Sequence, residues 1–365
     1  MTVAAPAGPL DFELPEDLIA TAPAEARGLC RDEVRLLVAR PGALAESTFR
    51  DLPRFLRPGD LLVVNVSATV PAAVRVIPDG PGVPPGVPEV DGGRLLHLST
   101  RMPGGLWLVE PRRPAGSGSL ELPGGGTAGE PLTLPGGASA RLLGPWPAGQ
   151  PEATARLWVA TVAVPGGDVH RWLAAHGRPI RYGVDPGDWP IASYQTVFAT
   201  EPGSAEMPSA GRGFTPELLT ALVAKGVGVT PLVLHTGVSS QEAGEPPYPE
   251  WYRVPAETAA RVNATRAAGG RIVAVGTTVT RALETVAAPD GGASTGEGWT
   301  ELVLGPDRPA RLVDGLITGW HEPRASHLDL LTAVAGTKLV AASYEAALAR
   351  GFLWHQFGDL HLLLP

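Results

Sequence analysis

The feature that most constrains the fold is an alternation of strand-like and helix-like segments from about residue 157 onward. Short apolar runs are typical of buried strands, and helical periodicity or capping residues follow most of them. This alternation predicts a three-layer α/β domain with a substantially parallel sheet. We expect strands at 227–235, 271–276, 311–318 and 358–364, and helices at 168–177, 215–226, 255–270, 277–288, 325–336 and 343–351.

Residues 73–156 interrupt this pattern and are rich in glycine and proline. Short apolar runs, such as GRLLHLST at 93–100, lie between frequent turn signals, which is typical of a small β-barrel or sandwich. A disordered linker is the alternative, but the regular spacing of the apolar runs favours a folded unit. We therefore expect a discontinuous α/β domain (1–72 and 157–365) that carries an inserted β-barrel domain at 73–156.

The charge balance is acidic, with 29 Lys and Arg residues against 37 Asp and Glu residues and a net charge of −8. Proteins that bind nucleic acids through phosphates usually carry a basic surface, and this total does not indicate one. Several arginines do cluster between residues 27 and 57. Acidic residues lie close to them in the sequence, so we expect a surface of paired charges there.

The single cysteine, Cys30, excludes a disulfide within the chain. The N-terminal residues do not form a secretory signal, and no apolar run approaches the ~18 residues that span a bilayer. We expect a cytoplasmic monomer with no membrane contact. The phosphate-binding loop, the dinucleotide fingerprint, the nucleophile elbow and the zinc-ligand spacings do not occur, so we expect no metal.

Polar residues follow three of the expected apolar strands. Open α/β sheets bind ligands beyond the carboxyl ends of their parallel strands. If these strands are neighbours, their polar residues converge on one crevice, which would be the functional site. The residues are His235, Thr277, Thr278, Thr318 and His321.

Structural roles remain open for several of these residues. Thr277 can cap the helix that follows it, and His235 can be a hydrogen-bonded core histidine. The turn GWHEPR at 319–324 makes His321 harder to explain by structure alone. Beyond it, Ser326 suits a helix N-cap, and we expect His327 and Asp329 to be structural residues of the first helical turn.

Six sequence blocks occur in a fixed order across almost the whole chain. They are DFELPEDLIATAP (11–23), RDLPRFLRPGDLLVVN (50–65), YQTVFATEPGSAEMPSAGRGFTPELL (194–219), GGRIVAVGTTVTRALE (269–284), LVDGLITGWHEPR (312–324) and FGDLHLLL (357–364). Together they resemble the S-adenosylmethionine:tRNA ribosyltransferase-isomerases of queuosine biosynthesis. The resemblance implies an α/β domain with an inserted β-barrel, in agreement with the pattern above.

The resemblance also implies an unusual reaction. S-adenosylmethionine, as co-substrate, donates its ribosyl part to the aminomethyl group of a 7-deazaguanine in tRNA. The ribose rearranges, and adenine and methionine leave. Such a reaction needs a base for the acidic carbon beside the sulfonium, a donor for the departing adenine and anchors for the methionine end.

Roles can be suggested for residues within the matching blocks and at the strand ends. His321 is the favoured general base, with His235 second, and Asp359 could orient a histidine or bind a ribose hydroxyl. Three groups of binding residues complete the expected site. Thr277, Thr278 and Arg271 would anchor the methionine end; Tyr194, Gln195, Ser209, Arg212 and Thr215 would line the adenosine or acceptor side; Thr318 and Asn65 would complete the wall.

The chain departs from the family pattern at several polar positions. Val66, Ala68 and Ala73 stand where the family has an acid and two arginines, and Arg212-Gly213 replaces a leucine and a histidine. Together with the net charge, these changes count against tRNA as the acceptor while the S-adenosylmethionine pocket is kept. Two alternatives therefore stay open: a related transferase or lyase that acts on a small molecule, and a non-catalytic S-adenosylmethionine-binding protein.

Overall fold

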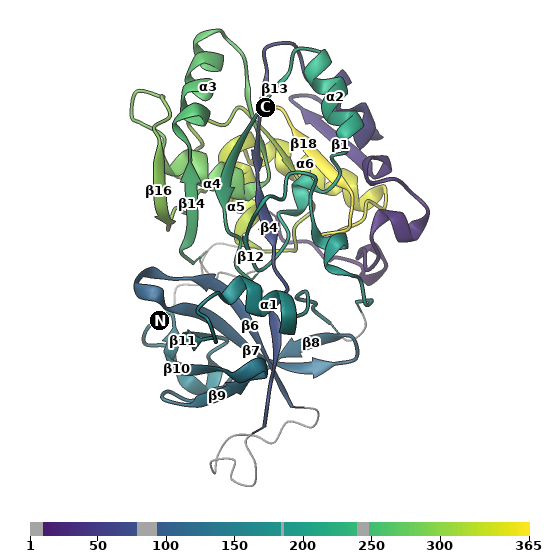
Figure 1. The fold of residues 1–365 in the computed structure, drawn as a ribbon. Coiled ribbons are helices and arrows are strands. Elements are labelled where there is room, and N and C mark those ends of the chain that lie inside the picture. Colours follow the sequence, from purple (N-terminus) through teal and green to yellow (C-terminus); the bar gives the residue numbers. More distant parts are fainter. Residues whose placement is uncertain (1–9, 79–92, 184–185, 239–247) are drawn as a thin grey trace, which may run out of the picture.

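The molecule has two lobes, each built on its own large β-sheet (Figure 1). The computed structural model describes residues 10–78, 93–183, 186–238 and 248–365. The upper lobe in Figure 1 holds the helices α2 to α6, and the lower lobe is almost entirely β-structure. The fold is thus of the mixed α/β class.

The sheet of the α/β lobe has nine strands in the order β16-β14-β13-β3-β15-β17-β18-β1-β2. The four strands β13, β3, β15 and β17 are parallel neighbours, and antiparallel strands extend the sheet on both sides. The sheet is therefore mixed, with a parallel centre. Its strands are β1 (Arg35–Arg40), β2 (Ala43–Thr48), β3 (Leu61–Asn65), β13 (Gly228–Leu234), β14 (Glu250–Val254), β15 (Ile272–Val275), β16 (Gly296–Thr300), β17 (Gly315–Thr318) and β18 (Leu360–Leu363).

Both faces of this sheet are buried. In β3, Leu61 and Val63 point into one apolar cluster, whereas Leu62 and Val64 point into another. The first cluster includes apolar residues of α3 to α6 and the second includes those of α2. A continuous apolar strand is what a sheet covered on both faces requires, because each face must be removed from water.

The helices begin and end close to the expected positions. Thr215 caps α2, since its side chain accepts a hydrogen bond from the backbone N–H of Leu218, and Pro216 takes the first helical position. The last helix begins earlier than expected, because Gly336, with φ of 76°, separates it directly from the preceding helix. The helices are α1 (Val169–His176), α2 (Pro216–Ala224), α3 (Ala256–Ala267), α4 (Thr277–Thr285), α5 (Ser326–Ala335) and α6 (Thr337–Ala349).

The second lobe is a nearly closed barrel-like sheet in the order β5-β6-β7-β11-β10-β9, with β8 added to β7. A backbone hydrogen bond from the Ile77 N–H to the Thr133 carbonyl, 2.9 Å long, links β5 toward β9 across the remaining gap. The strands are β5 (Ala73–Val76), β6 (Arg94–Arg101), β7 (Trp107–Ala115), β8 (Gly118–Glu121), β9 (Pro131–Leu134), β10 (Ala138–Trp146) and β11 (Leu157–Ala163).

The expected boundary at residue 157 is wrong by some 25 residues of chain. Strand β11 pairs with β10 and β7 and therefore completes the barrel sheet. Helix α1 also packs on this lobe, where Trp172 and Leu173 join its apolar cluster and the Trp172 indole donates to the Pro135 carbonyl at 2.8 Å. An apolar strand followed by a helix reads the same in either lobe, so local pattern could not assign this segment.

Candidate functional site

A cavity of about 930 Å³ lies between the two lobes. This volume is in the range of sites for small molecules and cofactors. Residues of both lobes line it. Arg112, Leu120, Glu121 and Tyr182 come from the barrel lobe, and Thr277, Thr278, Thr318, His321 and His327 come from the α/β lobe.

The α/β lobe meets the cavity at the carboxyl ends of its parallel strands, as the sequence predicted. Strand β3 lies between β13 and β15, so the three expected strands are not direct neighbours throughout. Their carboxyl ends nevertheless share one edge of the sheet. Thr277, Thr278, Thr318 and His321 line the cavity there, together with Thr236, which follows His235.

His321 is held by contacts on several sides. Its Nε2 shares a hydrogen bond of 2.9 Å with the Thr318 hydroxyl, and its backbone N–H donates to the Tyr344 hydroxyl at 3.2 Å. Its ring stacks on that of His327, with centroids 4.5 Å apart and planes 1° from parallel. Burial, and then the neighbouring His327, lowers the pKa of His321 well below its usual value. The imidazole is therefore neutral at pH 7 and able to accept a proton.

Thr277 and Thr278 form the first turn of α4, which starts directly after β15. Gly276 makes this possible with a φ of 101°, a conformation that favours glycine. The N-terminus of a helix favours anions, because its first N–H groups and the macrodipole point outward. The Thr278 hydroxyl also lies 3.4 Å from the Asn65 amide nitrogen at the end of β3.

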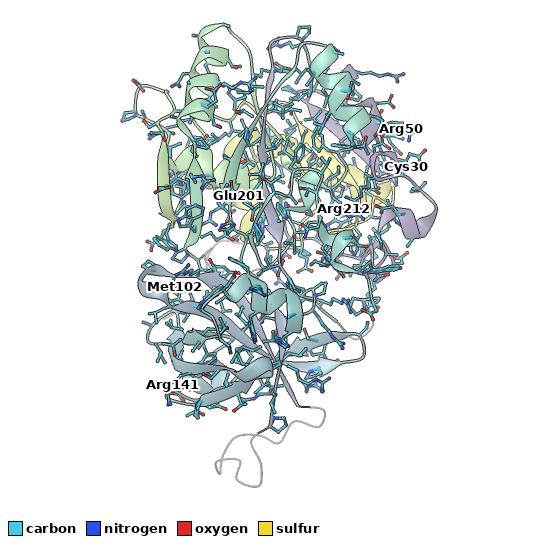
Figure 2. The ribbon with its side chains drawn as sticks, in the orientation of Figure 1. Cys30, Arg50, Met102, Arg141, Glu201 and Arg212 are labelled. Carbon is cyan, nitrogen blue, oxygen red and sulfur yellow. The ribbon has the colours of Figure 1, made fainter. Side chains whose placement is uncertain are left out.

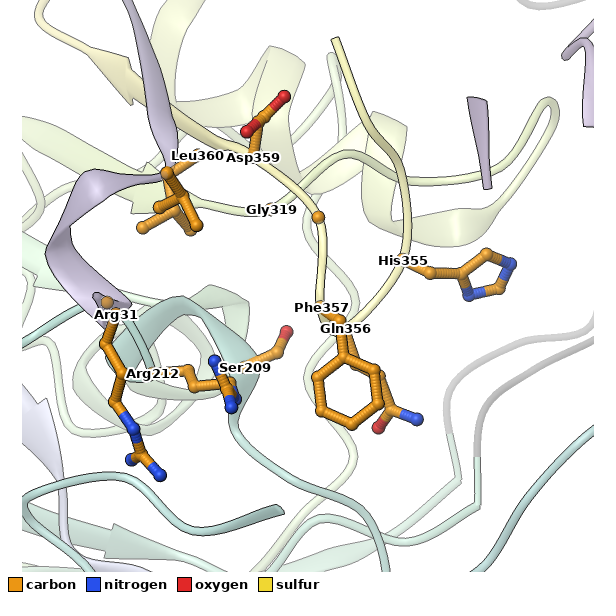
Figure 3. Close-up of a pocket in the computed structure, with 12 residues that line it drawn as sticks. Arg31, Ser209, Arg212, Gly319, His355, Gln356, Phe357, Asp359 and Leu360 are labelled. Atoms are coloured by element: carbon orange, nitrogen blue, oxygen red, sulfur yellow. The ribbon is translucent and has the colours of Figure 1, made fainter. Parts of the chain in front are cut away.

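A small pocket of about 10 Å³ adjoins the cavity and shares lining residues with it, Ser209 and Gly319 among them (Figure 3). Arg212 and Asp359 line this pocket from opposite sides. Arg212 pairs with Glu25 at 2.8 Å, and the Asp359 carboxylate accepts backbone hydrogen bonds from Arg35 and Leu353. Both side chains thus hold chain segments together beside the cavity.

Burial raises the pKa of Asp359 above its ordinary value. The neighbouring Gly213 lies in a tightly packed position, since an added Cβ would come within 2.8 Å of Phe49 and Leu360. A histidine could not occupy this position without moving the aromatic core beneath it.

Tyr194 lines the cavity, but the next residue does not. The Gln195 side chain is bound to the backbone of Thr69, accepting from its N–H at 3.0 Å and donating to its carbonyl at 2.8 Å. Asn65 similarly bridges the ends of β3 and β13 through the Leu234 backbone. Thr215 serves as the cap of α2.

Arg271 lies at the amino end of β15, the far end of that strand from Thr277. Its guanidinium pairs with the Asp60 carboxylate at 2.5 Å. An ion pair at the opposite edge of the sheet cannot anchor a ligand in the cavity, so we assign Arg271 a structural role.

His235 follows β13, but its imidazole is not part of the cavity wall. The Nδ1 atom shares a 2.8 Å hydrogen bond with the Ser67 hydroxyl, and the ring stacks on Trp251 with centroids 5.2 Å apart. Burial lowers its pKa to about 4. This environment is that of a hydrogen-bonded structural histidine.

Several cavity residues were not predicted. Tyr182 and Arg112 belong to the barrel lobe, and no periodicity in the sequence relates them to the strand ends. Glu206 lies in a loop within a recognised block but carried no signal of its own. His327, assigned to helix structure, both begins α5 and faces His321 across the cavity wall.

The N-terminal arginines are paired, as expected. Arg50, near Cys30 on the outer edge of the α/β lobe (Figure 2), lies 3.1 Å from both Asp32 and Glu33. Arg31, Arg35, Arg54 and Arg57 likewise have carboxylate partners. Compensated charges of this kind do not form a free phosphate-binding surface.

Two structural searches were negative within the residues described. Across residues 10–78, 93–183, 186–238 and 248–365, no His, Cys, Asp and Glu side chains gather in a group that could hold a metal ion. In the same portions of the chain, no helix has the length and apolar character to cross a bilayer.

Comparison with known proteins agrees with this architecture. The model of a family described as queuosine biosynthesis protein matches residues 8–363. A relative from Symbiobacterium thermophilum, named S-adenosylmethionine:tRNA ribosyltransferase-isomerase, is 36% identical, with 97% of this chain and 98% of the relative covered. One of the same name from Methylobacterium sp. (strain 4-46) is 38% identical, with 97% of each chain covered.

A solved structure is also similar along its whole length. The S-adenosylmethionine tRNA ribosyltransferase from Thermotoga maritima is 29% identical and superposes with a TM-score of 0.51, covering 98% of this chain and 100% of the other. The family model and the curated relatives each extend over nearly all of the sequence. This chain therefore belongs to the queuosine biosynthesis protein family.

Proposed function

We propose that this chain transfers the ribosyl part of S-adenosylmethionine to a 7-aminomethyl-7-deazaguanine in tRNA and isomerises it, releasing adenine and methionine. The observation that carries the proposal is the match over 97% of the chain to relatives named for this activity. The inter-lobe cavity supports it, because its volume suits S-adenosylmethionine together with part of an acceptor.

In this proposal His321 is the general base. The reaction requires removal of a proton from the carbon beside the sulfonium, whose positive charge makes that carbon acidic. A neutral imidazole in the cavity wall can take this proton, and the Thr318 hydroxyl fixes the ring orientation. His327, stacked on His321, opposes a second positive charge and so keeps His321 available as a base.

The remaining cavity residues bind. Thr277 and Thr278, at the N-terminus of α4, would bind the methionine carboxylate. Tyr194 and Ser209, on the wall formed by the 194–219 block, would contact the nucleoside or the acceptor base. Arg212 and Asp359, beside the cavity, would support that wall from behind.

We infer that tRNA is the acceptor. The relatives' printed names support this acceptor, and no observation favours either a small-molecule acceptor or a protein without catalysis. The net charge of −8 then describes the whole surface rather than the binding face. A tRNA substrate also implies a cytoplasmic enzyme; the monomeric state stays a prediction.

The lobes can be assigned as domains in the same proposal. A three-layer α/β domain would comprise residues 10–72 and 186–365, with helices on both faces of the nine-stranded sheet, and a barrel domain would comprise 73–183. The cavity would lie between the two, so both domains would contact substrate.

Incubation of the purified chain with S-adenosylmethionine tests the proposal, with and without tRNA that carries the deazaguanine. Adenine and methionine are measured by chromatography. We expect equimolar release only when that tRNA is present. Release that is independent of tRNA would identify a lyase or a small-molecule transferase, and tight binding without release would identify a binding protein.

A further inference from the structure

One carboxylate in the cavity receives a hydrogen bond from the opposite lobe. The Tyr182 hydroxyl, from the barrel lobe, donates to Oε1 of Glu206. Glu206 lies between strand β12 (Glu201–Ser204) and the short helix η9 (Ser209–Gly211), which leads along the strand-end side of the cavity. Both residues line the cavity, so their contact is part of its wall.

Tyr182 is held in place by a buried ionic cluster of the barrel lobe. The Arg112 guanidinium lies over its ring at 4.8 Å, and the His97 ring meets it edge-on at 5.9 Å. Arg112 in turn pairs with the buried Glu110 at 2.7 Å and donates to Ser119. The hydroxyl is thereby directed at Glu206 by a rigid set of neighbours.

The contact supplies a hydrogen bond but no positive charge. Burial, and then Glu206, raises the pKa of Tyr182 well above its ordinary value, so the phenol keeps its proton and donates. A carboxylate that accepts from a neutral donor remains negative, and it has about four acceptor positions in all. The cavity arginines differ, since Arg112 pairs with Glu110 and Arg181 pairs with Asp188 at 2.5 Å.

We propose that the Glu206 carboxylate binds a primary ammonium group of a substrate, in an ion pair completed only when the cavity is occupied. This inference rests on the proposed function, which brings two such groups to the cavity. One is the ammonium of the methionine end of S-adenosylmethionine, and the other is the protonated aminomethyl group of the acceptor base. Removal of one charged partner from a desolvated pair weakens binding strongly.

The deciding variant is E206Q, which has the shape of glutamate but no charge. A glutamine oxygen still accepts from a ribose hydroxyl, so this change separates recognition of a cation from recognition of a hydroxyl. The Kd of S-adenosylmethionine is measured by calorimetry without tRNA, and the KM of the deazaguanine tRNA is measured at saturating S-adenosylmethionine. We expect one of the two constants to rise about tenfold or more.

The constant that rises identifies the source of the ammonium. E121Q is the matched control, because Glu121 is an exposed carboxylate at the rim of the same cavity, and both constants should stay within about twofold. In E206D, which keeps the charge, the affected constant should stay within about threefold of the parent. E206D guards against a folding effect, and thermal unfolding is measured for every variant.

An active parent whose E206Q variant leaves both constants within about twofold would overturn the inference while leaving the proposed function intact. Equal weakening in E206Q and E206D would also overturn it, because charge would then not be the property that matters. Failure of the proposed function is a different result: the parent itself would release no adenine with tRNA.

Discussion

Two strand ends on the same edge of the sheet carry a histidine, and their surroundings differ. After β17, His321 faces the cavity and shares a hydrogen bond with Thr318. After β13, His235 turns to Ser67 and Trp251 instead. Burial lowers the pKa of both rings, so titration does not distinguish them. Position relative to the cavity does, which shows that a low pKa marks burial before it marks catalysis.

The largest expected effect follows removal of the cavity histidine. H321A should lower kcat by about 100-fold or more, because general base catalysis typically contributes that much. The measurement is tRNA-dependent adenine release under saturating substrates. Near-normal kcat in folded H321A would remove His321 from the chemistry.

A smaller effect should follow loss of the orienting hydroxyl. T318V keeps the side-chain shape and removes the hydrogen bond to His321, so kcat should fall by about 3- to 10-fold, the equivalent of one hydrogen bond. The double variant T318V/H321A serves as the control. It should be no slower than H321A; additive losses would show that Thr318 acts independently of His321.

The structural histidine should show the opposite balance of effects. H235A removes the hydrogen bond to Ser67 and the stacking on Trp251, and we expect a loss of about 1–3 kcal/mol in the free energy of unfolding. The kcat of the folded variant should stay within about threefold of the parent. Chemical denaturation and adenine release at the same temperature measure the two quantities; a 100-fold loss of kcat with unchanged stability would reverse the assignment.

The pH profile should show the smallest change. A base whose pKa is lowered stays unprotonated as the pH falls through about 6.5, the ordinary value for histidine, and loses activity only below it. We therefore expect kcat/KM to be nearly constant from pH 8 to 6.5. The groups around His321 are His327, His355, His361 and Glu322, of which Glu322 lies 3.0 Å from His355.

H327L should move the acid limb of that profile upward, because it removes a neighbouring imidazole while leaving the site buried. An acid limb already centred at or above about 6.5 in the parent would be inconsistent with a buried neutral base. In that case a group outside the His321 environment would limit the rate.

The extent of prediction from sequence follows from what local pattern encodes. Apolar runs and capping residues predicted the α/β elements and the strand ends, and Thr318 and His321 were found that way. Strand β11 was assigned to the wrong lobe, because a run such as LWVATVA does not specify its pairing partner. The contact between Tyr182 and Glu206 joins loops of different lobes, and only the folded chain brings them together.

A crystal structure with bound S-adenosylmethionine tests the central claim most directly. The account predicts that the ligand occupies the inter-lobe cavity, with its methionine end at Thr277 and Thr278 and its ribose facing His321. Ligand density beside His235 and Trp251, with the inter-lobe cavity left empty, would contradict it.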